Sequence, residues 1–346
     1  MTDKQWSDMK ALANGEKLDY DPIGFIIDSP WLPGWNNIST IEYYASDKLW
    51  YETNLRAINT FPDAWFIPGF WSEYGMCTEP SAFGARMVWS ETSLPHAGKV
   101  LDSIDDIDNL VSPVVETDGL LPFVIQRLKT IEDRITDAGH RIRFAVTRGP
   151  LNIASFLMGT TELMMALMTD PEKTHTLIRK ITDFINEWIE HQKSCFNSIE
   201  GIMVLDDIIG FVGENEFREF VIPYFHEIFS SAALPVRLLH NDANGLITAA
   251  NLNEISANVF NFSFEHSIKE IYELAGPDIV LLGNIPPRDI MAAGNETDVR
   301  NAVSKEIKNT PGDAKVIWSV GGGMAPGVPT GNIIAFMEAV REKRKN

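Results

Sequence analysis

Cysteine is almost absent from this chain, which has only Cys77 and Cys195 among its 346 residues. Two cysteines are too few for a disulfide framework, and they lie too far apart for a Cys-x-x-Cys metal clip. Both residues are therefore predicted to be plain thiols, and a thiolate-based zinc site is not expected.

Basic residues are also scarce, with 29 Lys and Arg against 48 Asp and Glu and a net charge of -19. A field of this sign repels nucleic acid and other polyanions, so nucleic acid is excluded as a partner. No apolar run approaches the roughly 20 residues that span a bilayer. The first residues, MTDKQWSDMKALANGE, lack the pattern of a signal peptide. A cytoplasmic protein without membrane contact is predicted.

Nucleotide-binding signatures are missing as well. No Gly-x-Gly-x-x-Gly follows a predicted strand, and GGGMAPG at 321–327 lacks the Lys-Ser/Thr of a P-loop. Its glycines permit positive φ and a close approach of the backbone to a ligand, or form a tight turn before the last helix.

Short β-rich runs alternate with amphipathic stretches through the second half of the chain. The runs are GIMVLDD (201–207), PVRLLHND (235–242), NVFNFSFE (258–265), DIVLLGNI (278–285) and KVIWSVGG (315–322). They are almost continuously apolar, which is typical of strands buried on both faces. Such alternation predicts a parallel α/β sheet, and the chain length favours a (β/α)8 TIM barrel over a doubly wound open sheet. We expect residues 1–346 to form one domain with an N-terminal helical extension.

The first half of the chain is less regular. Residues 39–60 are predicted to form a helix that leads into the first barrel strand, AWFIPGF at 64–70. Two glycines and a proline interrupt residues 75–94, so we expect an inserted loop or hairpin there rather than a helix. Further elements are expected as helices at 103–110 and 119–137 and as a strand at 141–147.

Polar side chains gather where the predicted strands end, and this end carries the chemistry in parallel barrels. Asp206 and Asp207 end one strand and point to opposite sides of it, so one is expected to face the barrel axis while the other caps a helix. His240 ends the next strand, and Asp242 lies on the same side two residues later, after Asn241. The remaining polar strand ends are Glu265 with His266, and Asn284.

His240 and Asp242 form a His-x-Asp pair, which can bind a metal ion or hold a proton donor. Imidazole and carboxylate ligands suit zinc, but a third ligand must come from another strand, such as Asp206 or Glu265. The alternative is a hydrogen-bonded histidine that orients its loop. Arg148 either anchors a substrate carboxylate or pairs with an aspartate of the barrel.

Aromatic residues are abundant, with 9 Trp and 19 Phe, and several lie in the loop-like stretch WFIPGFWSEYG at 65–75. Aromatic side chains in loops indicate a pocket for a flat or apolar ligand.

Five segments, taken in order, resemble the uroporphyrinogen decarboxylase-like superfamily, which includes porphyrinogen decarboxylases and corrinoid-dependent methyltransferases. They are RGPLNIASFLMG, LDDIIGFVGENEFREFVIPYFHEIF, LLHNDANG, LLGNIPPRDIMAAGNETDVRNAV and SVGGGMAPGVPTGNIIAFMEAV, and the resemblance covers residues 40–342. It implies a TIM barrel of the uroporphyrinogen decarboxylase type, with the inserted loop or hairpin after its first strand.

The chain departs from the two best-known branches of this superfamily. The decarboxylases carry an Arg-rich N-terminal segment that holds the carboxylates of the tetrapyrrole, whereas FIIDSPWLPGWNN at 25–37 contains no Arg or Lys. The methyltransferases that act on coenzyme M bind zinc through His-x-Cys and a distant Cys. In this chain His240 corresponds to that histidine, and Asp242 occupies the position of the first cysteine. Residues 321–323 lie near the position of the second cysteine. Zinc would therefore need ligands other than the usual cysteines.

The stretch FPDAWFIPGFWSEYGMCTEPSAFGA at 61–85 is similar to the substrate:corrinoid methyltransferase (methyltransferase I) components of anaerobic O-demethylase systems. This resemblance implies transfer of a methyl group from an aryl methyl ether to Co(I) of a corrinoid (cobalamin), on a separate carrier protein or free. Phenoxide is a poor leaving group, so the ether oxygen must be protonated or polarised by a metal. The predicted catalytic residues are His240, Asp242, Asp206 and Asp207, with His240 and Asp242 as metal ligands. The predicted substrate-binding residues are Trp65, Phe70, Trp71, Tyr74, Trp89, Arg148, Asn241 and Asn284.

Two other functions remain open. One is a decarboxylase or lyase on a smaller acid, with Arg148 as its anchor and Asp206 as the group that handles the proton. The other is a barrel that binds a tetrapyrrole or corrinoid without catalysis. Release of carbon dioxide would favour the first, and binding without turnover would favour the second.

Overall fold

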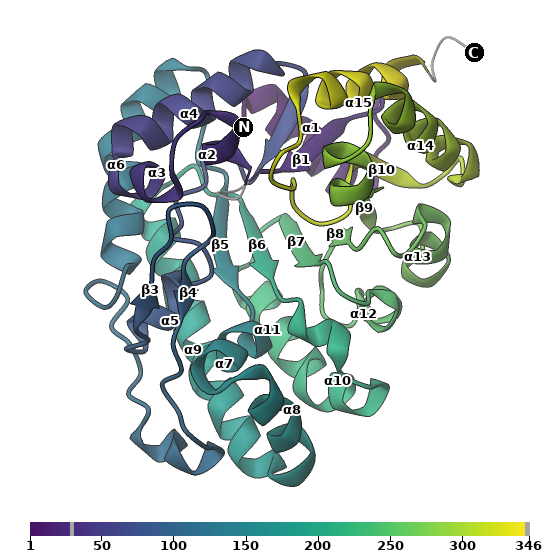
Figure 1. Cartoon of the computed structure of the whole chain (residues 1–346). Coiled ribbons are helices and arrows are strands. Elements are labelled where there is room, and N and C mark those ends of the chain that lie inside the picture. Colours follow the sequence, from purple (N-terminus) through teal and green to yellow (C-terminus); the bar gives the residue numbers. More distant parts are fainter. Residues whose placement is uncertain (28–30, 343–346) are drawn as a thin grey trace.

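Eight parallel strands form the centre of the molecule. The computed structural model describes residues 1–27 and 31–342, and its main sheet has the order β2-β1-β10-β9-β8-β7-β6-β5. The strands are β1 Ile23–Ile26, β2 Ala64–Ile67, β5 Phe144–Arg148, β6 Gly201–Leu205, β7 Val236–Asn241, β8 Val259–Phe262, β9 Val280–Ile285 and β10 Lys315–Val320. The sheet curls with helices around its outside (Figure 1). The predicted TIM-barrel fold is confirmed.

Helices link the strands and cover the outer face of the sheet (Figure 1). The α-helices are α1 Asp3–Ala13, α2 Leu32–Trp35, α3 Thr40–Ala45, α4 Asp47–Thr60, α5 Thr78–Ala82, α6 Leu121–Asp137, α7 Pro150–Met158, α8 Thr160–Thr169, α9 Pro171–Cys195, α10 Glu214–Phe220, α11 Ile222–Ser231, α12 Leu246–Asn251, α13 Ile268–Ala275, α14 Glu296–Asn309 and α15 Thr330–Glu342. Three short helices are η1 Ile104–Asn109, η2 Ile208–Phe211 and η3 Pro287–Ala292. Helices begin where the sequence provides caps; α9, for example, starts with Pro171 after the N-cap Asp170.

The inside of the barrel is apolar, and helix α1 closes its base. Met203, Leu238 and Leu282 belong to the interior cluster, together with Trp6 of α1. The Trp6 ring packs edge-on against Phe144 at the start of β5, with ring centroids 5.1 Å apart. The helix therefore covers the N-terminal ends of the strands and leaves the C-terminal ends as the open mouth.

The two edge strands, β2 and β5, are not neighbours in the hydrogen-bonded order of the described strands. The backbone of β5 is instead completed by Gln192 of α9, whose side-chain amide accepts a hydrogen bond from Val146 N–H (3.0 Å) and donates one to Val146 C=O (3.1 Å). At this seam a side chain thus takes the place of the eighth strand pairing, the one that would close the barrel, since a buried backbone group needs a partner.

Three predictions for the first half need correction. The first barrel strand is Ile23–Ile26, so the strand at 64–67 is the second. Four residues that include a glycine give little strand signal in the sequence. Glycine is nevertheless needed at position 24, because a Cβ there would lie 2.8 Å from the Ile317 side chain. The helix expected over 39–60 is two helices separated at Ser46, whose side chain caps the second by accepting a hydrogen bond from Leu49 N–H.

The excursion after β2 contains the expected hairpin, in which β3 Met87–Val88 and β4 His96–Ala97 pair antiparallel. It also contains the short helix α5, which the prediction excluded because of Pro80. Proline is tolerated there because the backbone N–H groups in the first turn of a helix have no intrahelical acceptor, so the missing N–H breaks no hydrogen bond.

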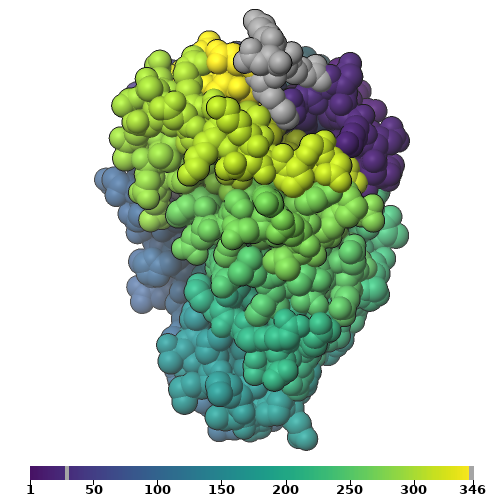
Figure 2. Space-filling view, turned by 90° about the vertical axis from the view of Figure 1, so that its right-hand side faces the viewer, coloured from purple at the N-terminus to yellow at the C-terminus, as the bar shows by residue number. Residues whose placement is uncertain are grey.

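The N-terminal and C-terminal parts of the chain lie side by side (Figure 2). Strand β1 pairs with β10 through Ile23 and Trp318, which joins the first strand of the barrel to the last. Among the described residues no single helix is long and apolar enough to cross a membrane; α7 and α8 reach that length together but are bent by 110° at their break.

Candidate active site

A cavity of about 620 Å³ opens at the C-terminal ends of the strands. This volume lies in the range of pockets that hold small organic ligands. The ionisable side chains in its lining are Glu73, Arg148, Asp207, His240, Asp242 and Arg288, and its aromatic ones are Trp71 and Phe264.

Strand register brings the polar residues of this cavity together. Leu205 of β6 lies beside His240 of β7, and His240 lies beside Asn261 of β8. Because Asp206 N–H donates to His240 C=O at 3.0 Å, the residue after it, Asp207, emerges next to the end of β7. The parallel sheet thus places Asp207, His240 and Asn261, which are separated by 33 and 21 residues in the sequence, at one edge.

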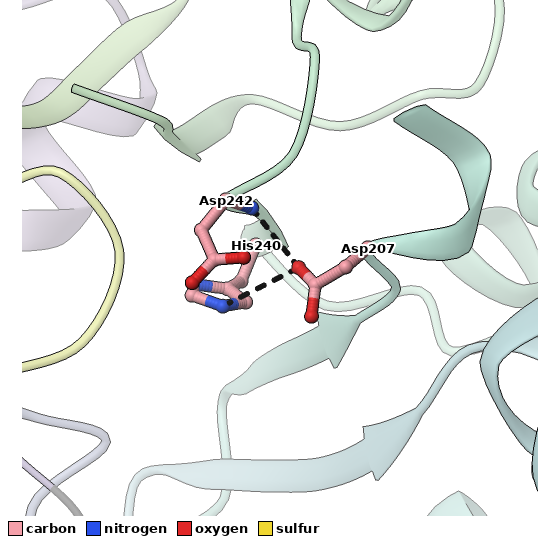
Figure 3. Close-up of side chains that lie close together, drawn as sticks. All are labelled: Asp207, His240 and Asp242. Atoms are coloured by element: carbon pink, nitrogen blue, oxygen red, sulfur yellow. Dashed lines mark hydrogen bonds and ion pairs between the residues drawn. The ribbon is translucent and has the colours of Figure 1, made fainter. Parts of the chain in front are cut away.

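Asp207, His240 and Asp242 form a compact cluster facing the cavity (Figure 3). The distance from His240 Nε2 to Asp207 Oδ1 is 3.7 Å, and Asp242 N–H donates to the same Asp207 oxygen at 2.9 Å. One ligand atom from each residue lies within 4.8 Å of the others. Burial, followed by repulsion from the Asp207 carboxylate, raises the pKa of Asp242. The cluster therefore concentrates negative charge beside an imidazole.

Asn261 supports this cluster from behind, and the sequence analysis missed it. His240 Nδ1 lies 2.6 Å from Asn261 Oδ1, and Asn261 Nδ2 donates to Leu282 C=O at 2.7 Å. Asn261 is fully buried. An asparagine in the middle of the apolar run VFNF is the signal that could have found it, since a buried amide needs specific partners.

Asp206 lies away from the cavity and caps helix α7. Its Oδ2 accepts hydrogen bonds from the N–H groups of Leu151 (2.9 Å) and Asn152 (3.1 Å), and its Oδ1 accepts one from Ile208 N–H (3.1 Å). A Cβ on Gly149 would lie 2.4 Å from this carboxylate, so glycine is required at that position. Burial raises the pKa of Asp206 to about 8, although the backbone donors oppose the shift. Of the two adjacent aspartates, Asp207 is the one in the cavity lining.

Arg148 lies in the cavity lining but is paired with a residue that the sequence analysis did not single out. Its Nη2 donates to Glu73 Oε2 at 2.9 Å, and each side chain is only 8% exposed. The guanidinium also lies over the Trp71 ring, 5.6 Å from its centroid. Glu73 belongs to the aromatic stretch WSEYG. A single acidic residue among aromatic ones is the sequence signal that could have identified it as a site residue.

Trp71 is the member of the predicted aromatic set that lines the cavity. Trp65 is buried inside the barrel, Phe70 stacks on Tyr51, and Tyr74 accepts a hydrogen bond from buried Arg127. Trp89 is 43% exposed and packs against Tyr44 and Tyr74. These four lie outside the lining because strand and loop direction turn them toward the core or the solvent.

The predicted asparagines also lie outside the cavity lining. Asn241 is fully buried and points toward α12, where it bonds Asn244 C=O and Thr248 Oγ1. Asn284 donates to His266 C=O at 2.5 Å. Glu265 is exposed to solvent and lies outside the metal-competent cluster.

The glycine loop after β10 lies against the cluster. Gly322 has φ +82°, and a Cβ there would lie 2.9 Å from Asp242. Both the left-handed backbone and the close approach require glycine. The loop therefore positions Asp242 and contributes backbone to the cavity wall.

The donor set of Asp207, His240 and Asp242 fits a divalent metal ion. Catalytic zinc sites use three protein ligands, drawn from imidazole nitrogens and carboxylate oxygens among others, and keep a further position for substrate. Asp207, rather than Asp206 or Glu265, is the residue that lies close enough to His240 and Asp242 to complete such a set. Among the residues that the structure describes, this is the one group of three or more such side chains close enough to share an ion.

Comparisons with known proteins agree with this architecture. The sequence model of a family described as Uroporphyrinogen decarboxylase (URO-D) matches residues 10–343. A uroporphyrinogen decarboxylase of Dichelobacter nodosus is 22% identical over 271 residues, which cover 77% of this chain and 76% of the relative. One of Corynebacterium diphtheriae is 27% identical over 213 residues, which cover 59% of each.

A solved structure with this fold is a methyltransferase from Methanosarcina mazei. It superposes with a TM-score of 0.82 over 98% of both chains, at 16% sequence identity. At that identity the likeness shows the fold.

Proposed function

The chain belongs to the uroporphyrinogen decarboxylase family, and within it we propose a methyltransferase that moves a methyl group from a methoxylated aromatic compound to Co(I) of a corrinoid. The observation that carries the proposal is the Asp207, His240 and Asp242 cluster in the lining of a cavity of about 620 Å³. An arrangement of this kind can hold a metal ion against a bound ligand.

Charge in the cavity favours this reaction over decarboxylation of a tetrapyrrole with many carboxylates. The basic side chains among the described lining residues are Arg148 and Arg288, apart from the imidazole of His240. Arg148 is already paired with Glu73, and two further carboxylates face the same space. A substrate with many negative charges would meet repulsion here, and the chain's net charge of -19 adds to it.

Zinc is the metal that we assign to Asp207, His240 and Asp242. When bound, it would supply a Lewis acid that polarises the ether oxygen and so stabilises the charge that develops on the leaving group. Each of the three residues would contribute one ligand atom. Trp71 and Phe264, the aromatic side chains of the lining, provide apolar faces for a substrate ring.

The reaction balances without an external oxidant or reductant. The electron pair of Co(I) forms the bond to the methyl carbon, and the electron pair of the broken C–O bond stays on oxygen as phenolate. The corrinoid acts as a second substrate, delivered on a carrier protein or free in solution, and it would approach from the solvent side of the mouth. The residues of this chain bind the methyl donor and orient its methoxyl group toward that side.

An anaerobic assay with reduced cobalamin and a panel of methoxylated aromatics tests the proposal through the absorbance of methyl-Co(III). We expect methylation with at least one donor and its loss in Asp207→Asn. Glu265→Gln, an exposed carboxylate at another strand end, serves as the matched control. If no donor in the panel gives methyl-Co(III) although the corrinoid is shown to be reduced, methyl transfer is refuted. Release of carbon dioxide from a smaller acid would instead establish the lyase alternative, and ligand binding without any turnover would establish the non-catalytic one.

A further inference from the structure

Asn261 and His240 form a buried polar pair on adjacent strands. Asn261 is fully buried and His240 is 6% exposed, and the register of β7 and β8 places the two residues opposite one another. The distance from His240 Nδ1 to Asn261 Oδ1 is 2.6 Å. Water cannot replace either partner at such depth, so the bond between them decides where the imidazole proton resides.

The orientation of the Asn261 amide follows from its second partner. Its NH2 group donates to Leu282 C=O at 2.7 Å, which can only accept. The opposite orientation would place two carbonyl oxygens at that distance without a hydrogen between them. The Asn261 oxygen therefore faces His240, and an oxygen acceptor at 2.6 Å requires a proton on Nδ1.

A neutral His240 with its proton on Nδ1 has its lone pair on Nε2. That nitrogen lies 3.7 Å from Asp207 Oδ1 on the side of the cavity. It can bind a metal ion but has no proton to give. The arrangement thus distinguishes the two chemical roles open to this histidine, metal ligand and proton donor.

We propose that Asn261 is a positioning residue that holds His240 in the Nδ1–H tautomer and so makes Nε2 a metal-ligand nitrogen. This inference rests on the proposed function only in naming zinc as the ion. An outer partner that orients a ligating histidine typically contributes about 10- to 100-fold to metal affinity.

Nitrogen NMR of the histidine rings in the metal-free protein, at a pH where His240 is neutral, tests the tautomer without any variant. We expect a protonated Nδ1 and an unprotonated Nε2. A protonated Nε2 would overturn the inference. Zinc affinity, measured by competition with a chelator, then tests the consequence in variants.

Asn261→Leu removes the acceptor while keeping a similar volume, and we expect zinc to bind about 10- to 100-fold more weakly. Asn54→Leu is the matched control, because it removes a buried asparagine of α4 whose amide donates to Tyr43 Oη and Trp50 C=O, away from the cluster. Unchanged tautomer and affinity in folded Asn261→Leu would contradict the inference.

These readouts separate the inference from the proposed function. Zinc binding with the expected tautomer but without methyl transfer would refute the function and leave the role of Asn261 standing. Methyl transfer with a protonated Nε2 would support the function and refute the role of Asn261.

Discussion

Charged side chains form matched ion pairs at the base of the barrel, whereas at its mouth two carboxylates lie close to one another. At the base, Arg143 forms ion pairs with Asp3 and Glu200, and Glu200 also pairs with Lys10 at 3.0 Å. At the mouth, the carboxylates of Asp207 and Asp242 lie close together, and no described Lys or Arg forms an ion pair with either.

The base is arranged for stability, whereas the mouth holds the groups that we propose to carry the function. Helix α1 seals the base with apolar side chains and matched charges. Repulsion between nearby carboxylates destabilises the folded state, so such a pair at the mouth indicates a position reserved for a cation or a ligand. Changes at the mouth should therefore alter activity, and changes at the base should alter stability.

His240→Ala should produce the largest effect, because it removes the nitrogen that we propose as a metal ligand and leaves two carboxylates that repel one another. We expect methyl transfer to fall by roughly 10³-fold or more, whereas the free energy of unfolding should fall by only about 1–3 kcal/mol, because the buried Asn261 oxygen loses its partner. His226→Ala, an exposed histidine that contacts Glu254 C=O, should retain full activity. Substantial turnover in His240→Ala would remove this residue from the mechanism.

Trp6→Ala should produce the reverse pattern at the base. The ring is 2% exposed, and its indole N–H donates to Glu200 at 2.6 Å. Its loss should lower the free energy of unfolding by about 3–5 kcal/mol, because a large cavity is left in the packed interior. Turnover per folded molecule should not change. The exposed Trp89→Ala provides the comparison, and an equal loss of stability there would contradict the assignment.

His140 should make the stability of the protein depend on pH. Burial lowers the pKa of His140 from 6.5 to about 4, so between these values the unfolded chain binds a proton that the folded protein does not. Stability is complete above about pH 6.5 and decreases as the pH falls toward 4, by about 2–3 kcal/mol in total. Urea unfolding at several pH values should show a shallower dependence in His140→Gln than in the wild type.

Trp71→Leu should have the smallest effect. Loss of an aromatic wall should weaken binding of the methyl donor by about 5- to 10-fold, equivalent to about 1 kcal/mol. The change should fall on KM rather than kcat, because the cluster of Asp207, His240 and Asp242 is intact. Trp89→Leu, outside the cavity, should leave KM unchanged, and an equal rise in both variants would argue against Trp71 as a ring contact.

The repeating elements of the fold could be predicted from sequence because the physical signal is local. Continuous apolar runs such as those ending at Leu205 and Leu282 identify buried parallel strands without knowledge of their neighbours. Ile23–Ile26 was missed because four residues that include a glycine give no such run. Its pairing with β2 and β10 is tertiary information.

The candidate site could be predicted only in part. Polar residues at strand ends pointed to His240 and Asp242, but side-chain direction after a strand depends on the loop that follows. For that reason the sequence could not decide between Asp206 and Asp207. Asn261 and Glu73 were missed because their roles depend on partners, Leu282 and Arg148, that only the folded sheet brings near.

We propose that a methyl group moves from oxygen to cobalt at the cluster of Asp207, His240 and Asp242. The most direct measurement is a single turnover with a donor whose methoxyl carbon is isotopically labelled, in the presence of zinc and Co(I) cobalamin, with the label followed by NMR. We expect the label to appear as methyl bound to cobalt in the wild type and to stay on oxygen in Asp207→Asn. Label that remains on oxygen in the zinc-loaded wild type, with every methoxylated donor and with reduced cobalt confirmed, would contradict it.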